Sequence, residues 1–283
     1  MYSTNLQRPV VIKQIAAKLS NGTKLDFSVN FTKHFEIENK VRTLFIIEEI
    51  PNSGIAIIDG DEGHHAATVL RIEVGEEILI SDGRGNWAEA VVIERSKKSI
   101  SCEITKSGAI GPAAIKLTCI QALPKSDRVK ETLELLTEAG VDQIIPWSAS
   151  KSIAKWSDKA SGLQKWQTQV REASKQARRF RIPEVIDLRS TNELKEQCRD
   201  FDLILVFHES ANISFTALIS RLEVSAYKNI AVVIGPEGGI SESEIEIFES
   251  VGGKLVKLGA PVFRSAHAGV AALAAIQTAF KMW

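Results

Sequence analysis

From Gly111-Pro112 to the C-terminus, short apolar runs alternate with helical stretches. Five of these runs predict strands, over residues 116–122, 143–146, 203–207, 230–234 and 255–258. Strands that alternate with helices form parallel sheets, and helices then cover both faces of the sheet. The pattern therefore predicts an α/β domain over residues 113–283.

Local signals place three helices in this domain. In the stretch 126–139, Val129, Leu133 and Leu136 recur at spacings of four and three, which is typical of one helix face. Ser241 followed by Glu244 predicts a capping box at the start of a second helix. The last stretch, 265–281, is rich in alanine, which favours close packing against a loop or a second subunit.

Residues 41–112 have a different pattern. Short β-rich runs are separated by turns that are rich in Gly and Asp, which predicts a small β-barrel. These runs are 43–48, 55–58, 77–81, 87–94 and 99–105. An amphipathic stretch, 64–71, predicts one or two helical turns. Residues 1–40 show neither the helical nor the strand period of apolar residues, so we expect a weakly structured N-terminal extension there.

The composition is that of an ordinary soluble globular protein, with 44% hydrophobic and 25% charged residues among 283. The formal net charge is zero, so no global field draws the chain to nucleic acid or to an anionic membrane. Cys102, Cys119 and Cys198 show no CxxC spacing, and no apolar run approaches the ~20 residues of a membrane span. We expect a cytoplasmic protein without disulfides, a zinc site or a membrane anchor.

The strongest local signal is the glycine-rich loop from Gly235 to Gly239, which follows one predicted strand and precedes a capped helix. Open α/β sheets bind ligands at the carboxyl ends of their strands. The loop matches neither GxGxxG nor a P-loop, and the Glu237 carboxylate would repel phosphates. Two interpretations stay open, namely a site for a cationic or uncharged ligand and a turn that only reverses the chain.

A second glycine-bearing loop, 258–264, ends with Arg264 just before an apolar helix. A cation gains nothing from the positive end of a helix dipole, so Arg264 is a candidate functional side chain. An exposed arginine at the end of a loop is the simpler alternative.

Basic residues are concentrated between Lys151 and Arg181, where nine stand against two acidic residues. Binding to a phosphate backbone requires such a patch, and a solvated helix face is the alternative. Residues 41–112 carry seven basic and twelve acidic residues, so RNA contacts there would depend on a few side chains such as His64, Arg71 and Arg84. The adjacent His64 and His65 diverge on a helix and lack a third ligand, which argues against a metal site.

Several segments match one known family in the same order. They are His64-His65, Val69 to Arg71, Gln121 to Lys125, Glu138 to Val141, Ala173 to Arg179, Ile182 to Glu184, Val233 to Gly239 and Leu258 to Arg264. Together they resemble the bacterial 16S ribosomal RNA uridine-N3 methyltransferase family, from Val41 to the C-terminus.

The resemblance implies a PUA-like RNA-binding barrel followed by a SPOUT-type methyltransferase domain, in which the C-terminal chain forms a trefoil knot. It also implies a homodimer that uses S-adenosylmethionine to methylate uridine 1498 of 16S rRNA in the assembled small ribosomal subunit. The residues that would then hold the cofactor are Phe207, His208, Gly235, Pro236, Glu237, Gly238, Gly239, Leu258, Gly259, Val262 and Phe263.

Transfer of a methyl group from a sulfonium to N3 of uridine needs no metal, so positioning and electrostatics must do most of the work. We expect Arg264 to contact the uracil and to stabilise the charge on its carbonyl oxygen. Glu237 is a candidate general base, and His267 is an alternative. The candidates for RNA binding are His64, Arg71, Lys125, Arg171, Lys175, Arg178 and Arg179.

After Arg264, members of the family commonly read Thr-Glu-Thr-Ala, whereas this chain reads Ser265-Ala266-His267-Ala268. A role of that glutamate therefore cannot be transferred. Three other functions stay open: methylation of another RNA site, RNA binding without catalysis, and an enzyme for a small molecule. A non-catalytic binder would not need the glycine loops, and a small-molecule enzyme would not need the basic stretch.

Overall fold

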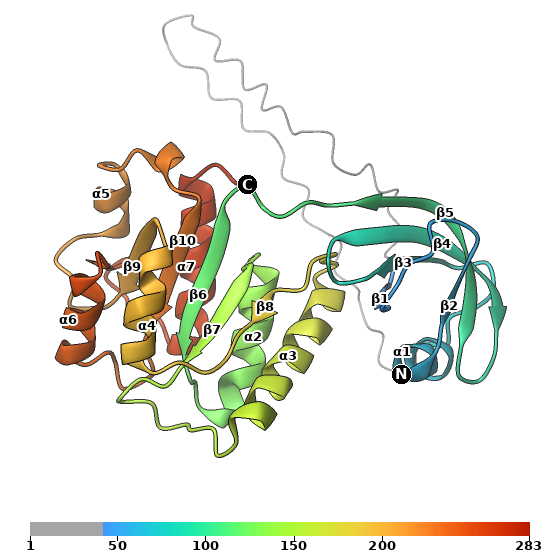
Figure 1. The fold of residues 1–283 in the computed structure, drawn as a ribbon, viewed down its shortest axis with the longest axis horizontal. Helices are drawn as coiled ribbons and strands as arrows, with labels where there is room; N and C mark the ends of the chain where they lie inside the picture. Colours follow the sequence, from blue (N-terminus) through green and yellow to red (C-terminus); the bar gives the residue numbers. More distant parts are fainter. Residues whose placement is uncertain (1–41) are drawn as a thin grey trace, which may run out of the picture. The chain divides into compact units, whose positions relative to one another are not determined.

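The computed structural model describes residues 42–283, so the predicted extension over residues 1–40 lies outside the described residues. The first sheet has five strands in the order β1-β3-β4-β5-β2 (Figure 1). They are β1 (Leu44–Ile46), β2 (Ile55–Ile58), β3 (Glu77–Ser81), β4 (Asn86–Arg95) and β5 (Ile100–Ala109). β1 pairs with β3 in parallel, and the other neighbours are antiparallel. All five β-rich runs of the sequence are thus confirmed as strands.

The short helix beside this sheet begins earlier than the sequence predicted. α1 (Gly60–His64) is followed directly by a π-helical turn, His65–Val69. Gly63 explains the difference, because a Cβ at this position would collide with the backbone carbonyls of Ile58 and Lys98. Glycine is usually unfavourable inside a helix, but here Gly63 lets α1 pack closely against the neighbouring backbone.

The second sheet has six strands in the order β11-β9-β10-β6-β7-β8, and every neighbouring pair is parallel. They are β6 (Lys116–Ala122), β7 (Gln143–Trp147), β8 (Glu184–Val185), β9 (Leu203–Phe207), β10 (Asn229–Ile234) and β11 (Lys254–Val256). The predicted parallel α/β sheet is confirmed. β8 was not predicted, because two residues are too few to show a period.

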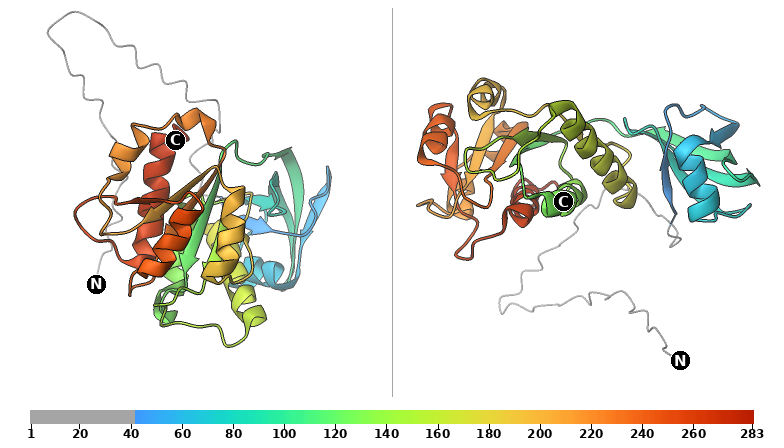
Figure 2. Two further views of the ribbon diagram at one scale, coloured as in Figure 1. Left: turned by 60° about the vertical axis from the view of Figure 1, so that its left-hand side comes forward. Right: turned by 90° about the horizontal axis from the view of Figure 1, so that it is seen from below.

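Helices cover both faces of this sheet (Figures 1 and 2). Alternate strand residues pack into two separate clusters; Leu117 and Val232 belong to one, and Ile120 and Val233 to the other. The first cluster includes residues of α2 (Val129–Glu138), α3 (Lys159–Gln176), α5 (Phe215–Ile219) and α7 (Ser265–Ala279), and the second those of α4 (Thr191–Gln197) and α6 (Glu242–Ser250). None of the described helices is long and apolar enough to cross a membrane. The trefoil knot stays a prediction.

The register of the parallel strands brings four strand ends to one edge of the sheet. Ile234 of β10 pairs with Gln121 of β6 and with Phe207 of β9, which in turn pairs with Val256 of β11. The loops that follow these strands therefore meet at the same edge. Ligands of parallel α/β sheets bind there.

Glu244 fixes one side of this edge. It forms the predicted capping box with Ser241, and it also accepts hydrogen bonds from Ser150 N (2.8 Å) and Thr191 Oγ1 (3.0 Å). Burial opposes ionisation of this carboxyl group, but the hydrogen bonds from Ser150 and Ser241 outweigh it, so the pKa of Glu244 is lowered. One buried carboxylate thus ties α6 to the segment that follows β7 and to the start of α4.

Candidate active site

A cavity of about 460 Å³ opens at this edge of the six-stranded sheet. Its volume falls in the range of roughly 300–1,000 Å³ that is typical of small-molecule sites. Most of the sequence-predicted cofactor residues line it, although they come from three separate loops. These residues are Phe207, His208, Gly235, Pro236, Glu237, Gly239, Val262 and Phe263, and Arg264 lies beside them.

The other three predicted cofactor residues lie nearby. Leu258 and Gly259 line a smaller adjoining cavity of about 90 Å³, which shares Phe207 and His208 with the larger one. Gly238 lines neither cavity; a Cβ there would lie 3.0 Å from Lys151 Cβ and 3.1 Å from its carbonyl oxygen. The absence of a side chain at Gly238 therefore lets the loop fit against the segment that follows β7.

The glycine loop is a tight turn whose shape needs glycine at two further positions. Gly239 has a φ of +76°, and its N–H donates to Pro236 O at 2.9 Å. A Cβ at Gly235 would lie 2.7 Å from Ile240 Cγ1. The loop thus reverses the chain and also forms part of the cavity wall, so a turn and a ligand site are compatible at this position.

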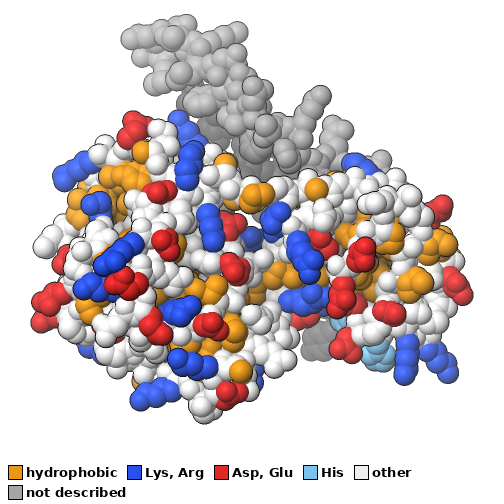
Figure 3. All heavy atoms as spheres, viewed as in Figure 1, with side chains coloured by type: hydrophobic (Ala, Val, Ile, Leu, Met, Phe, Trp, Pro, Cys, Tyr) orange, Lys and Arg blue, Asp and Glu red, His pale blue; other side chains and the backbone are white. Residues whose placement is uncertain are grey.

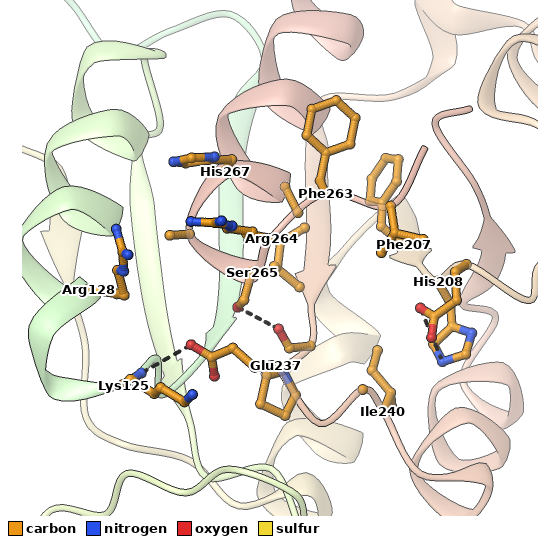
Figure 4. Close-up of a pocket in the computed structure, with 18 of the residues that line it drawn as sticks. Lys125, Arg128, Phe207, His208, Glu237, Ile240, Phe263, Arg264, Ser265 and His267 are labelled. Atoms are coloured by element: carbon orange, nitrogen blue, oxygen red, sulfur yellow. Dashed lines mark hydrogen bonds and ion pairs between the residues drawn. The ribbon is translucent and has the colours of Figure 1, made fainter. Parts of the chain in front are cut away.

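Glu237 is held in this wall by the backbone. Its Oε1 atom accepts a hydrogen bond from Lys125 N at 3.3 Å, which links the glycine loop to the turn after β6 (Figure 4). Its Oε2 atom accepts no hydrogen bond from residues 42–283, and the side chain is exposed. Glu237 thus presents a positioned carboxylate oxygen that is free to interact with a ligand.

Arg264 is the N-cap residue of α7, but its side chain makes no capping hydrogen bond. It is exposed and extends toward α2, on the side of the cavity where Glu237 and Arg128 lie (Figure 4). The next residue anchors the start of the helix, because Ser265 Oγ donates to Gly235 O at 2.7 Å and accepts from Gln121 Nε2 at 3.3 Å. The backbone of Arg264 is fixed, while no acidic residue in the described part of the chain pairs with its guanidinium.

Sequence reasoning missed one cluster of charged residues in the cavity. Glu131 accepts a hydrogen bond from His267 Nε2 at 3.0 Å and another from Arg128 Nη1 at 2.8 Å. The His267 bond is the larger cause and the Arg128 bond the next, and both hold the pKa of Glu131 below its ordinary value. Arg128 and Glu131 stand at the i, i+3 spacing of a pair on one helix turn, and no local sequence signal identifies His267 as their partner.

The structure separates the predicted RNA-binding residues. Lys125 lines the cavity. Arg171, Lys175 and Arg179 are instead engaged within the protein: Arg171 Nη2 donates to Ile46 O at 2.7 Å, and Lys175 Nζ pairs with Glu62 at 2.8 Å. Apart from Glu172, which also pairs with Lys175, their acidic and carbonyl partners lie outside the stretch 151–181, and for this reason the stretch looked largely unpaired. Their role toward RNA stays a prediction.

Arg178, His64 and Arg71 are exposed and do not line the cavity. Arg178 has a φ of +50° and forms the left-handed residue of a helix C-terminal turn, in which Arg179 N donates to Ser174 O at 2.9 Å. On the face seen in Figure 3, Lys and Arg side chains are interspersed with Asp and Glu rather than gathered in one area. Attraction for an anion on this face must therefore be local.

We expect Arg179→Ala to lower the free energy of unfolding by about 2–4 kcal/mol, because two carbonyl groups lose a charged donor. Arg179 Nη1 donates to Thr137 O at 2.9 Å and to Val141 O at 2.7 Å, and burial lowers the pKa of this arginine. Urea denaturation measures the change.

Arg178→Ala is the matched control for this experiment. Arg178 is adjacent and exposed, so its loss should change the free energy of unfolding by no more than about 0.5 kcal/mol. If Arg179→Ala left stability unchanged but weakened RNA binding, Arg179 would be a phosphate ligand and not a structural residue.

Comparisons with known proteins agree with this architecture. Residues 112–277, more than half of the chain, match the model of an RNA methyltransferase domain, and residues 58–105 match that of an RNA methyltransferase PUA domain. The ribosomal RNA small subunit methyltransferase E of Mycobacterium bovis is 36% identical over 86% of this chain and 94% of its own length. The protein of the same name from Bacillus subtilis is 30% identical over 81% of this chain and 91% of its own length.

A solved structure shows the same fold. It is the ribosomal RNA small subunit methyltransferase E of Neisseria gonorrhoeae bound to S-adenosylmethionine, with a TM-score of 0.73 and 25% identity. The match covers 84% of this chain and 97% of that one.

Proposed function

This chain belongs to the ribosomal RNA small subunit methyltransferase E family, and on that premise we propose that it methylates N3 of one uridine in 16S rRNA, with S-adenosylmethionine as the methyl donor. The observation that carries the proposal is the cavity at the strand ends, where Glu237 and Arg264 accompany two glycine-bearing loops. The sequence left three other functions open. Membership of this family argues against two of them, namely an enzyme for a small molecule and an RNA-binding protein without catalysis.

The residues of the cavity fit the proposed methyl donor. Phe207, Val262 and Phe263 supply apolar surface for an adenosine group, and a Cβ at Gly239 would point toward His208 Nε2 and Glu209 Oε1, each 4.0 Å away. A Cβ at this distance would make only ordinary contacts, so glycine is required there by the positive φ of Gly239 and not by lack of space. Carboxylates such as Glu209 suit a cationic ligand better than a polyphosphate. Bound S-adenosylmethionine supplies an activated methyl group on its sulfonium.

Arg264 is proposed to stabilise the uracil as it loses its N3 proton. Loss of that proton spreads negative charge onto the neighbouring carbonyl oxygens, and an unpaired guanidinium that faces the cavity can donate hydrogen bonds to one of them. The tie between Ser265 and Gly235 holds the backbone of Arg264 in place before the RNA arrives. The energetic cost of ordering the loop is thus met during folding.

Glu237 is proposed to accept the N3 proton. The Lys125 N–H fixes one carboxylate oxygen, and the other has no partner among the described residues. His267 is the alternative, but its Nε2 atom already donates to Glu131. Because N3 lies in the Watson–Crick edge, the target uridine must be unpaired or extruded when it enters the cavity. Lys125, which lines the cavity, is proposed to hold a phosphate near the target, and the exposed Arg178, which lies outside the cavity, is proposed to hold one farther along the RNA.

The finer parts of the proposal concern the target and the assembly. We propose uridine 1498 in the assembled small subunit as the substrate, a cytoplasmic location, and a homodimer. The exposed side chains of Val262 (72%) and Phe263 (48%) next to the cavity support a subunit contact at these loops.

The direct test is incubation of the purified protein and labelled S-adenosylmethionine with small ribosomal subunits from a strain that lacks the enzyme. Mass spectrometry of the 16S rRNA then maps the product. We expect a single N3-methyluridine at position 1498. Label at another nucleotide would redirect the proposal to a different RNA site, and binding of the methyl donor without any label would contradict the assignment of this substrate.

A further inference from the structure

A second cavity, of about 330 Å³, lies between the turn after β6 and the first turns of α3. We call it the Trp156 cavity; its apolar surface comes from Leu123, Pro124, Val129, Trp156 and Trp166. Lys155 and Lys165 also line it, together with the hydroxyl groups of Ser126, Ser157 and Ser161. An aromatic wall with lysines beside it is the arrangement that binds a base and its phosphate in single-stranded RNA.

The indole of Trp156 is held in a defined position. It makes an edge-to-face contact with Trp166, with ring centroids 5.5 Å apart and an angle of 77° between the planes. Gly162 lies against the ring, because a Cβ there would collide with Cδ2, Cε3 and Cγ of Trp156. Trp166 is buried, whereas Trp156 is partly exposed, so Trp156 is the ring available to a ligand.

The two lysines are free to meet a phosphate. Lys155 and Lys165 are exposed, and neither forms an ion pair with a residue of the described chain. The carboxylate in this cavity, Asp158, already accepts hydrogen bonds from the N–H and hydroxyl of Ser161 as the N-cap of α3. The two lysines therefore give the cavity a local positive charge that favours an anion. Lys175, near the other end of α3, differs from them because Glu62 and Glu172 neutralise its charge.

The position of the Trp156 cavity links it to the candidate active site. The turn after β6 forms part of both walls: Pro124 and Ser126 line the Trp156 cavity, and Lys125 lines the active-site cavity and binds Glu237. A chain that places one nucleotide in the active site can therefore reach the Trp156 cavity by crossing a single turn.

We propose that the Trp156 cavity binds one nucleotide of the single-stranded RNA next to the target uridine, with its base against Trp156 and its phosphate between Lys155 and Lys165. This inference rests on the proposed function. It assigns the RNA path to the N-terminal part of the basic stretch 151–181, since Arg171, Lys175 and Arg179 in the C-terminal part are engaged within the protein.

The test measures binding and methylation of unmethylated small ribosomal subunits by four variants. Trp156→Ala and Lys155→Glu/Lys165→Glu should each weaken binding and raise KM by about ten-fold or more, with kcat and the Kd of S-adenosylmethionine nearly unchanged. Gly162→Ala should do the same by displacing the indole, without loss of the aromatic ring. Trp156→Phe, which retains a ring, should recover much of the affinity.

Lys254→Glu is the matched control for charge, because Lys254 is exposed at the opposite, amino-terminal end of β11. The double lysine variant should also lower the slope of log Kd against log salt by about one, because the two lysines share one phosphate, and the control should not. Equal KM values for the cavity variants and wild type would overturn the proposal. So would dissociation of an oligomer in the same variants, which would identify the cavity as a subunit contact.

Failure of the proposed function gives a different result. In that case no variant and no wild-type protein methylates the subunit, whereas failure of the inference alone leaves methylation intact in every cavity variant. Inhibition of wild-type binding by micromolar AMP or UMP would indicate a free nucleotide as the ligand, and would also overturn the assignment to RNA.

Discussion

Arg264→Ala is expected to lower kcat by about 10²–10³-fold, which is typical for loss of one donor to a developing oxyanion. The affinity for S-adenosylmethionine should change little, because Arg264 extends toward α2, away from Phe207 and His208 (Figure 4). Steady-state kinetics with small ribosomal subunits measure kcat, and titration calorimetry measures the affinity for the methyl donor.

Arg264→Lys is the informative companion of this variant. Lysine keeps the positive charge but lacks the planar, forked donor group. A kcat above that of Arg264→Ala would therefore indicate that the charge contributes. A kcat still below that of the wild type would indicate that the planar geometry of the guanidinium contributes as well. Arg221→Ala, an exposed arginine that does not line the cavity, controls for loss of a surface charge. A parallel fall in kcat and in affinity for the methyl donor would contradict the proposed role and make Arg264 part of the cofactor site.

The second large effect is expected for Glu237→Gln, which should lower kcat by about 10²–10⁴-fold if this carboxylate accepts the N3 proton. Glutamine retains an oxygen that can accept the hydrogen bond from Lys125 N, so the loop should keep its shape. The Kd of S-adenosylmethionine should therefore stay near the wild-type value. Single-turnover methylation separates the chemical step from RNA binding.

The control for Glu237→Gln is Glu242→Gln, the same change on the exposed first turn of α6, outside the cavity. It should leave kcat unchanged. If Glu237→Gln retained full activity and His267→Ala lost it, the proton acceptor would be the imidazole that Glu131 positions.

Much of the fold was accessible from local sequence patterns. The apolar run at 203–207 and the capping box of Ser241 and Glu244 were both predicted correctly, because each depends on residues within a few positions of one another. β8 was missed, since its two residues carry no period. α1 was placed too late, because the close approach that requires Gly63 involves Lys98, far along the chain.

The candidate site was predictable as a location and less so as a set of contacts. Loops at the carboxyl ends of parallel strands meet at one edge, so the glycine loop was a sound candidate before any contact was known. The network of Arg128, Glu131 and His267 was not predictable from local patterns. Its hydrogen bond between Glu131 and His267 joins two helices, and these two residues are 136 positions apart in the sequence.

The sequence by itself determined the parallel α/β class, the strand-rich segment before it, and the loops that carry Glu237 and Arg264. Period, caps and turns are local properties, so a short window of residues contains them. Only the tertiary structure decided which basic residues are free. Lys175 pairs with Glu62, 113 residues away, whereas Lys155 and Lys165 line an open cavity. The net charge of a segment does not reveal this difference, because whether a charge is neutralised depends on which distant side chains the fold brings within a few ångströms.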